Sequence, residues 1–260
     1  MLNKGKTLTG YSLQNTDGQT IGKTKEFYLD DRHWTIRYLV ADTGNWLTGR
    51  QVLISPHALV AVNSDRQNIV TDLSKKQIEE SPAVATDKPV SRQREEELHS
   101  YYGWSPYWSM GPYAGVGYPV PGSLPVGGQA GAHVEAKPTG DPTLRSMKQV
   151  RGYPIQGADG EIGHVEDFVI DDGTWAIRYL MVATRNWWPG KNVLVSPQWI
   201  ERVSWSESKV FVNLSRDAIK QSPEYTEESL ITRDYETDLH RHYDRQGYWV
   251  AEPVVTEHSH

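Results

Sequence analysis

The chain has 260 residues, of which 37% are hydrophobic and 23% are charged, a composition typical of a folded protein and not of a disordered one. Cysteine is absent, which excludes disulfides, thiolate metal sites and a cysteine nucleophile. The formal net charge is −6, which argues against a nonspecific nucleic-acid binder. This charge lies wholly in the second half of the chain, because residues 1–130 carry equal numbers of acidic and basic side chains.

The first hundred residues read mainly as short strands separated by turns. Alternating apolar residues and turn signals predict strands over residues 7–13, 20–29, 33–41, 51–54, 59–62 and 68–72. Ser55-Pro56 is typical of the capped start of a short helical turn, and Ser74 with Gln77 has capping-box spacing. A longer helix is expected over residues 91–102. Many short strands with little room for helices favour a small closed barrel.

The same pattern then returns, so the chain contains an internal duplication. Residues 10–18 reappear as residues 152–160, and residues 36–39 are repeated letter for letter as residues 177–180. The match reaches the helix that ends the repeat, in these pairs: Arg92 and Arg233, Glu95 and Glu236, His99 and His240, Tyr102 and Tyr243. The repeating unit is about 95–100 residues long, which is the size of a small domain and not of a solenoid repeat.

We therefore divide the chain into a first domain (1–102), a linker (103–142), a second domain (143–250) and a tail (251–260). The linker holds 9 Gly and 7 Pro, a composition that breaks helices and strands. Its first half is rich in aromatic side chains, namely Trp104, Tyr107, Trp108, Tyr113 and Tyr118. We expect these rings to fold back onto the first domain, and the alternative is an aromatic and proline-rich docking segment for a partner. Trp104 and Trp249 lie close in repeat phase without being aligned.

The order of motifs resembles a known domain family. Gly-Tyr, Asp-Gly-x(1–2)-Ile-Gly, Asp-Asp, Trp-x-Ile-Arg-Tyr-Leu and Ser-Pro follow one another in both copies. This order resembles the PRC-barrel domain, which the H subunit of purple-bacterial photosynthetic reaction centres shares with the C-terminal part of RimM-type ribosome-maturation factors. The resemblance covers residues 5–82 and 147–223. It implies a mainly β fold of two tandem small barrels, each followed by short helices, that serves in assembly and interaction without catalytic residues, cofactor or metal.

Several polar residues could be interpreted as functional, and each has a simpler structural explanation. Gly22 and Gly163, together with Gly18 and Gly160, are explained better by hairpin geometry than by a phosphate loop. Asp30-Asp31 with His33 could bind a metal or relay protons, but a solvated turn is favoured, since the second copy has Thr174 in place of His33. Ser55 is interpreted as a helix cap and not as a nucleophile, because no nucleophile elbow surrounds it.

Two further groups occur in both copies. Arg37 and Arg178 interrupt apolar strands, which indicates an ion pair or a cation–π stack, the functional alternative being contact with an anion or a partner's carboxylate. Glu95 and His99 lie one helical turn apart, as do Glu236 and His240. A surface Glu–His pair is the expected arrangement in each helix.

The loop tryptophans are the best candidates for binding. Trp46 precedes Arg50 in the first copy, and Trp187 and Trp188 precede Lys191 in the second. Tryptophans next to a cation are common in binding hot spots, but they can equally be lids that close the end of a small barrel. We name these five residues as candidate partner-binding residues.

The expected function is that of a non-enzymatic cytoplasmic scaffold or adaptor whose partner is a protein. No secretory signal pattern and no apolar run near the roughly 18 residues of a membrane span is present. The two barrels are expected to pair within the chain as a pseudo-twofold dimer, and the alternative is a homodimer of whole chains. The alternative functions are an accessory role in photosynthetic light reactions and a role in ribosome assembly.

Overall fold

The computed structural model describes residues 1–47, 49–82, 90, 92–108, 144–184, 191–226 and 230–250. The chain folds into two compact units, each built around one mainly antiparallel seven-stranded sheet. The first-repeat unit comprises residues 8–147 and 172–176, and the second-repeat unit comprises residues 1–7, 148–171 and 177–260. None of the helices in the described residues is long and apolar enough to span a membrane.

In the first-repeat unit the strands are hydrogen-bonded in the order β5-β4-β3-β2-β7-β6. They are β2 (Ser12–Asn15), β3 (Thr20–Asp30), β4 (Thr35–Asp42), β5 (Gln51–Ile54), β6 (Leu59–Asn63) and β7 (Asn68–Thr71). Only β2 and β7 pair in parallel among the strands of this unit. The helices are α2 (Lys75–Glu79) and α3 (Arg92–Tyr102), with short 3-10 turns η1 (Gly44–Leu47) and η2 (Pro56–Ala58). The expected strands after residue 20 and both expected helices are confirmed.

The second-repeat unit repeats this order as β12-β11-β10-β9-β14-β13. Its strands are β9 (Pro154–Gly157), β10 (Gly160–Asp171), β11 (Ile177–Ala183), β12 (Asn192–Val195), β13 (Ile200–Ser204) and β14 (Lys209–Val212). Its helical elements are α4 (Met147–Val150), α5 (Arg216–Gln221), α6 (Arg233–His242), η3 (Pro197–Trp199) and η4 (Tyr248–Val250). The predicted serine caps are present: Ser55 accepts a backbone N–H bond at η2, and Ser74 forms a full capping box with Gln77. Ser196 caps η3 in the same way as Ser55 caps η2.

Each sheet is completed by the strand that begins the other copy of the repeat. β1 (Leu2–Lys4) pairs antiparallel with β10, so that Lys4 lies opposite Val169. β8 (Leu144–Ser146) occupies the equivalent place on β3, with Leu144 opposite Asp30. Residues 2–4 and 144–146 correspond in the duplication, so the two copies have exchanged their first strands.

The prediction of a strand over residues 7–13 is right only for Ser12 and Leu13 and wrong for the residues before them. Residues 5–8 form a short helix, α1 (Gly5–Leu8), and β2 begins only at Ser12. The backbone N–H of Lys6 donates to Asp167 Oδ2 at 3.0 Å, and Arg151 binds the other oxygen of Asp167 at 2.7 Å. A buried carboxylate therefore holds the chain as it leaves β1, and this long-range contact overrides the local strand propensity.

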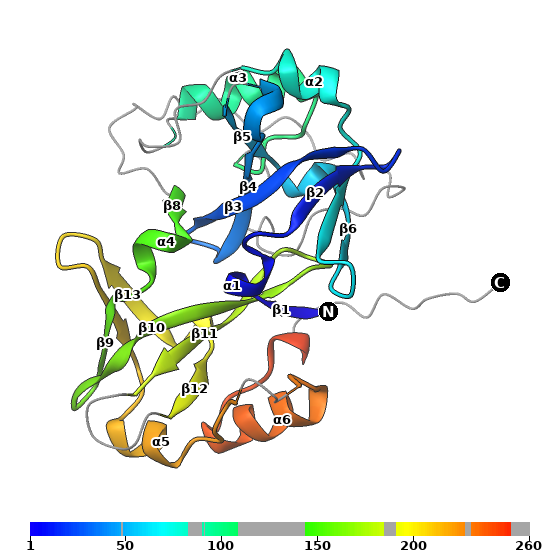
Figure 1. Ribbon diagram of the computed structural model, residues 1–260. Coiled ribbons are helices and arrows are strands. Elements are labelled where there is room, and N and C mark those ends of the chain that lie inside the picture. The colour runs from blue at the N-terminus through cyan, green and yellow to red at the C-terminus, as the bar shows by residue number, and fades with distance from the viewer. Residues whose placement is uncertain are drawn as a thin grey trace. The chain divides into compact units, whose positions relative to one another are not determined.

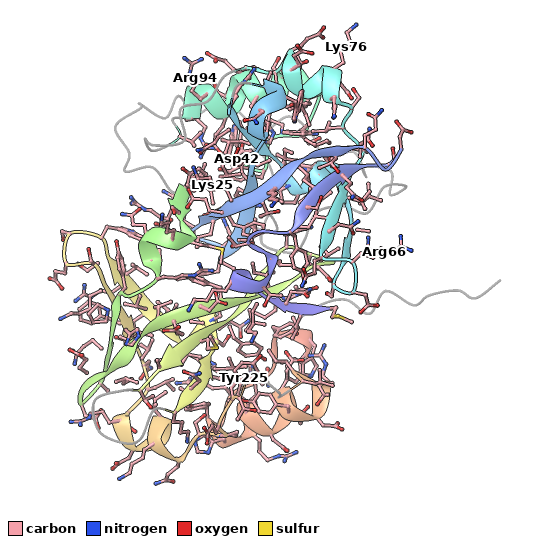
Figure 2. The ribbon with its side chains drawn as sticks, in the orientation of Figure 1. Lys25, Asp42, Arg66, Lys76, Arg94 and Tyr225 are labelled. Atoms are coloured by element: carbon pink, nitrogen blue, oxygen red, sulfur yellow. The ribbon has the colours of Figure 1, made fainter. Side chains whose placement is uncertain are left out.

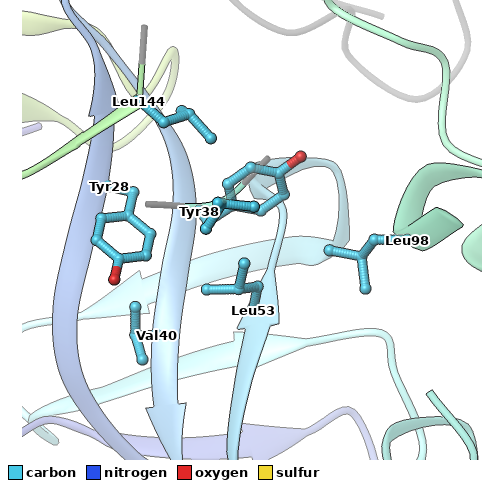
Figure 3. Packing of buried hydrophobic residues seen from close by; sticks show 7 residues of the cluster. Tyr28, Tyr38, Val40, Leu53, Leu98 and Leu144 are labelled. Carbon is cyan, nitrogen blue, oxygen red and sulfur yellow. The ribbon is translucent and has the colours of Figure 1, made fainter. Parts of the chain in front are cut away.

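The core of the first-repeat unit lies between the sheet and α3 (Figure 3). Tyr38, Val40 and Leu53 of the sheet pack against Leu98 of α3, and Leu144 of the exchanged β8 joins them. Every residue of β4 except the last is buried, because both faces of this strand are covered. The outer surface of the same helices carries long cations, among them Lys76 on α2 and Arg94 on α3 (Figure 2). Figure 1 shows α2 and α3 beside β5.

Close approach of strands, and not the hairpin turn, explains Gly22. A Cβ at Gly22 would clash with the backbone carbonyl of Asp42, and one at Gly163 would clash with that of Ala183. The turn itself uses Gly18, whose φ of +79° favours glycine. The hairpin explanation is therefore right for Gly18 and must be replaced by strand contact for Gly22 and Gly163.

Candidate functional site

A buried group of polar side chains joins α3 to the sheet. Tyr38 extends from the middle of β4, while Glu95 and His99, four residues apart, lie on one face of α3. The Tyr38 hydroxyl lies 2.9 Å from His99 Nε2 and 3.2 Å from Glu95 Oε1. All three side chains are at most 3% exposed. The prediction of a surface Glu–His pair is therefore wrong, because this face of the helix packs onto the sheet.

The Glu95 carboxylate is bound on both oxygens. Tyr107 donates its hydroxyl to Oε1 at 2.6 Å, and the Arg92 guanidinium lies 2.9 Å from Oε2. Burial raises the pKa of Glu95, although the hydrogen bond from Tyr107 and the charge of Arg92 act in the opposite direction. Burial also raises the pKa of Tyr107 far above its ordinary value, so that the phenol stays a donor. A buried carboxylate is tolerated here because its partners surround it.

His99 is neutral at physiological pH. Burial lowers the pKa of His99 to about 4, and repulsion from His57 adds to the effect. The imidazole contacts the ring of Trp104 edge-on, at a centroid distance of 5.7 Å. An uncharged ring is therefore held between the Tyr38 hydroxyl and the aromatic segment that follows α3.

The second repeat builds the same group from its own residues. The Tyr179 hydroxyl lies 2.9 Å from Glu236 Oε1 and 3.1 Å from His240 Nε2. Tyr248 donates to Glu236 at 2.8 Å, as Tyr107 does to Glu95. The two imidazoles differ in their other contacts. His240 Nδ1 lies 2.9 Å from the Gln246 carbonyl, whereas the His99 imidazole interacts with the backbone of Trp104 and Ser105.

The mid-strand arginines form both kinds of contact that the sequence predicts. Arg37 Nη2 lies 2.9 Å from Asp30 Oδ2, and the guanidinium stacks 4.1 Å from the centre of the Tyr107 ring. Arg178 has matching contacts with Asp171 at 2.8 Å and with the Tyr248 ring at 4.0 Å. These contacts confirm the structural interpretation of Arg37 and Arg178.

Asp30 does not lie in a solvated turn, so that prediction is wrong. It is 2% exposed, and its Oδ2 also lies 2.9 Å from His33 Nδ1. Burial alone would raise the pKa of Asp30, but the bonds from His33 and the charge of Arg37 outweigh it and lower the pKa. The described residues contain no cluster of three or more His, Asp or Glu side chains that could hold a metal ion.

The loop candidates are engaged in contacts within the chain. The Trp46 indole N–H donates to the Ile21 carbonyl at 2.5 Å, and Lys75 Nζ lies 5.3 Å from the centre of the ring. Arg50 donates to the backbone carbonyls of Glu79, at 3.1 Å, and Ser81. Trp46 and Arg50 are therefore brought to opposite ends of α2.

The second copy keeps the cationic part of this arrangement. Lys191, the counterpart of Arg50, donates to the carbonyls of Lys220, at 2.9 Å, and Ser222. Both cations bind the carbonyls that a helix leaves free at its C-terminal end. Burial lowers the pKa of Lys191. Trp187 and Trp188 lie outside the described residues.

The aromatic segment after α3 folds back onto the first repeat, as expected for its first three rings. His99 contacts the rings of Tyr107 and Trp108 at centroid distances of 6.1 and 4.8 Å. His240 contacts Trp249 in the same way, at 5.0 Å. Tyr113 and Tyr118 lie outside the described residues.

The sequence carries a further signal for this site. Tyr107-Trp108 and Tyr248-Trp249 keep the offset of 141 residues, so the duplication continues into the segment interpreted as a linker. The true counterpart of Trp249 is Trp108, and Trp104 corresponds to Arg245. Repetition of Glu, His and Tyr at identical spacing was the available evidence that these residues are buried partners.

The fold and the repeated polar group thus define a protein built from two small β domains with attached helices. The family model of the PRC-barrel domain matches residues 3–78 and 142–219, more than half of the chain. The chain therefore belongs to the PRC-barrel family. A comparison with curated proteins found no match. Membership supports, in general terms, a role in protein interaction or as an adaptor.

Proposed function

We propose that this protein is a non-enzymatic cytoplasmic scaffold that binds a protein partner through the surfaces of its two PRC barrels. The supporting observation is a contrast between the inside and the outside of the two copies. The buried Tyr–Glu–His group and the Asp–Arg pair recur with nearly equal distances. In both copies the Tyr–Glu–His group joins the terminal helix to the sheet.

The exposed residues on the same helices differ. Glu96 and Ser100 on α3 correspond to Thr237 and Arg241 on α6, so the charges at these two exposed positions differ between the copies. A duplicated chain with one interior and two different surfaces can contact two regions of a partner or two partners. Complementary charges mainly determine which partner is selected and how fast it associates.

The test is capture followed by reconstitution with the full chain. The tagged protein is cross-linked in cell extract, captured proteins are identified, and each candidate is purified and titrated against the chain. A saturable complex of defined stoichiometry is the expected result. Trp46→Ala is compared with Trp205→Ala, a half-buried tryptophan of the second repeat that contacts Tyr153, to decide whether the loop tryptophan contributes.

Failure of every captured protein to form a complex with the purified chain would contradict the proposal. So would turnover of a small molecule by the chain that one side-chain change abolishes. The identity of the partner also decides between the narrower roles, since a photosynthetic complex and a ribosomal subunit are distinct captured species.

A further inference from the structure

The surface beside His99 in the first-repeat unit is hollowed into a pocket of about 460 Å³. Glu96, His99 and Ser100 of α3 line one side of it, and Trp104, Pro106 and Trp108 of the following segment line the other. The volume is large enough for one long side chain of a binding partner. All the lining residues belong to one unit of the fold.

The chemistry of the walls favours a cation. The two tryptophans are half-buried, so part of each indole faces the solvent, and the Glu96 carboxylate at the rim is exposed. Within the described part of the chain, no ion pair of Glu96 is observed. Indole rings attract guanidinium and ammonium groups electrostatically. Trp108 already accepts one, because the Arg92 guanidinium lies 4.3 Å from the centre of its ring.

The His99 side chain adds no positive charge to the pocket. The low pKa of His99 keeps its imidazole uncharged at neutral pH. The backbone of Trp104 and Ser105 already interacts with this imidazole, as the Gln246 carbonyl does with His240.

The second repeat has exchanged these features for positive charge. Ser100 corresponds to Arg241, Trp104 to Arg245 and Glu96 to Thr237. Arg241 is paired with Asp238 at 2.7 Å, and neither arginine offers the carboxylate or the indole that a cation contacts in the first repeat. The duplication therefore provides a natural reference in which the same fold lacks the same chemistry.

We propose that this pocket binds an arginine or lysine side chain presented by an extended segment of the protein partner. The proposal rests on the proposed function and names the kind of residue that the first repeat would recognise. The carboxylate of Glu96 and the two indoles would hold the cationic head.

The probe is a capped Gly-Arg-Gly peptide, with the same peptide carrying neutral citrulline as its control. Binding to the full chain is followed by NMR through the indole N–H signals of Trp104 and Trp108, assigned by substitution. The arginine peptide should shift both signals in a saturable manner. The citrulline peptide should bind about fivefold more weakly or not at all.

Two variants locate the binding without disturbing the core. Glu96→Gln removes the rim charge, and Ser100→Arg places at an exposed position the residue that the second repeat has there. Each should weaken the arginine peptide about threefold to tenfold. The matched controls are Glu97→Gln, which removes a charge from α3 outside the pocket, and Arg241→Ser on α6, and both should bind as the unmodified chain does.

Equal binding of the two peptides, unchanged binding by Ser100→Arg, or no binding at all would overturn the pocket assignment. The last result includes the case in which another segment of this chain fills the pocket. If Ser100→Arg still forms the reconstituted complex, the pocket assignment is contradicted but the scaffold function is not. If no purified partner forms a complex with the unmodified chain, both proposals are contradicted.

Discussion

The hydroxyl of Tyr38 contacts two side chains of α3 that have different requirements. Glu95 needs donors in the core, and His99 needs a partner for Nε2 while it stays uncharged. The Tyr38 hydroxyl contacts both side chains, so its removal changes the environments of Tyr38, Glu95 and His99 together.

Tyr38→Phe should lower the free energy of unfolding by about 1–3 kcal/mol, because it leaves buried polar atoms of Glu95 and His99 with fewer partners. Urea denaturation measures the change. Tyr101→Phe is the control, since it removes a hydroxyl that bonds the Gln77 carbonyl at an exposed position, and it should cost less than about 0.5 kcal/mol. Equal losses in the two variants would show that the buried group does not bear on stability.

The depressed pKa of His99 predicts a pH dependence with a definite sign. The folded pKa of about 4 lies below the ordinary value of 6.5, so the unfolded chain binds the proton more readily. The contribution of His99 to stability is therefore complete above pH 6.5, falls as the pH is lowered and levels off below pH 4. The raised pKa of Glu95 acts in the opposite direction, and its contribution falls as the pH rises through the folded value.

A comparison of the unmodified chain with His99→Gln isolates this contribution. Between pH 6.5 and 5, the unmodified chain should lose about 1–2 kcal/mol more than the variant does. Urea denaturation at the two pH values measures both chains. Parallel pH dependence in the two would contradict the assignment of a low pKa to His99.

At this scale the sequence predicted the partners of Arg37 and Arg178 correctly and the surroundings of Glu95 and His99 incorrectly. A spacing of four residues places Glu95 and His99 on one face of a helix, but it does not say whether that face meets water or a sheet. The partner that settles the question, Tyr38, lies 57 residues before Glu95. Only the exact recurrence of all three residues in the second copy pointed to it.

Among the elements, α2 and α5 each receive a cation from the loop that precedes β5 or β12. Arg50 and Lys191 bind carbonyls at the ends of these helices at equivalent positions. Both helices are short, so a large share of their carbonyl groups lies at the end.

Arg50→Met should therefore reduce stability by about 1 kcal/mol, since it keeps the length of the side chain and removes the donors. Lys76→Met changes an exposed cation on α2 itself and should have little effect. Thermal unfolding of both variants measures the difference. If Arg50→Met is as stable as the unmodified chain but binds the partner less well, Arg50 is a binding residue and the helix contact is incidental.

Most elements could be predicted because their signals are local. Strand alternation, the serine caps and the Asp-Gly turn each lie within a few residues, and the structure has them. The beginning of each repeat could not be predicted in this way. The local sequence of residues 7–13 favours a strand, whereas the carboxylate of Asp167, distant in sequence, holds the backbone of Lys6 in α1.

At the scale of the whole molecule, exchange of the first strands makes each unit depend on both copies. The duplication hides this exchange from the sequence, because β1 and β8 are equivalent segments and either could in principle pair with β3 or β10. The choice depends on the path of the chain and on side-chain contacts such as Arg145 with Asp31, at 3.5 Å.

Removal of residues 1–7 should expose one edge of β10 and leave β3 covered by β8. Amide hydrogen exchange of residues 169–171 should accelerate about tenfold or more, while exchange at residues 28–30 should change little. Acceleration at both places, or at neither, would contradict the strand exchange.

The central claim is that the buried polar groups maintain the fold while the exposed surface selects the partner. The most direct measurement is the dissociation constant of the reconstituted partner complex for the unmodified chain, Tyr38→Phe and Ser100→Arg, at a temperature where all three are folded. The account predicts an affinity for Tyr38→Phe within about twofold of the unmodified chain and a loss of about tenfold for Ser100→Arg. Loss of binding in Tyr38→Phe with full binding in Ser100→Arg would contradict it.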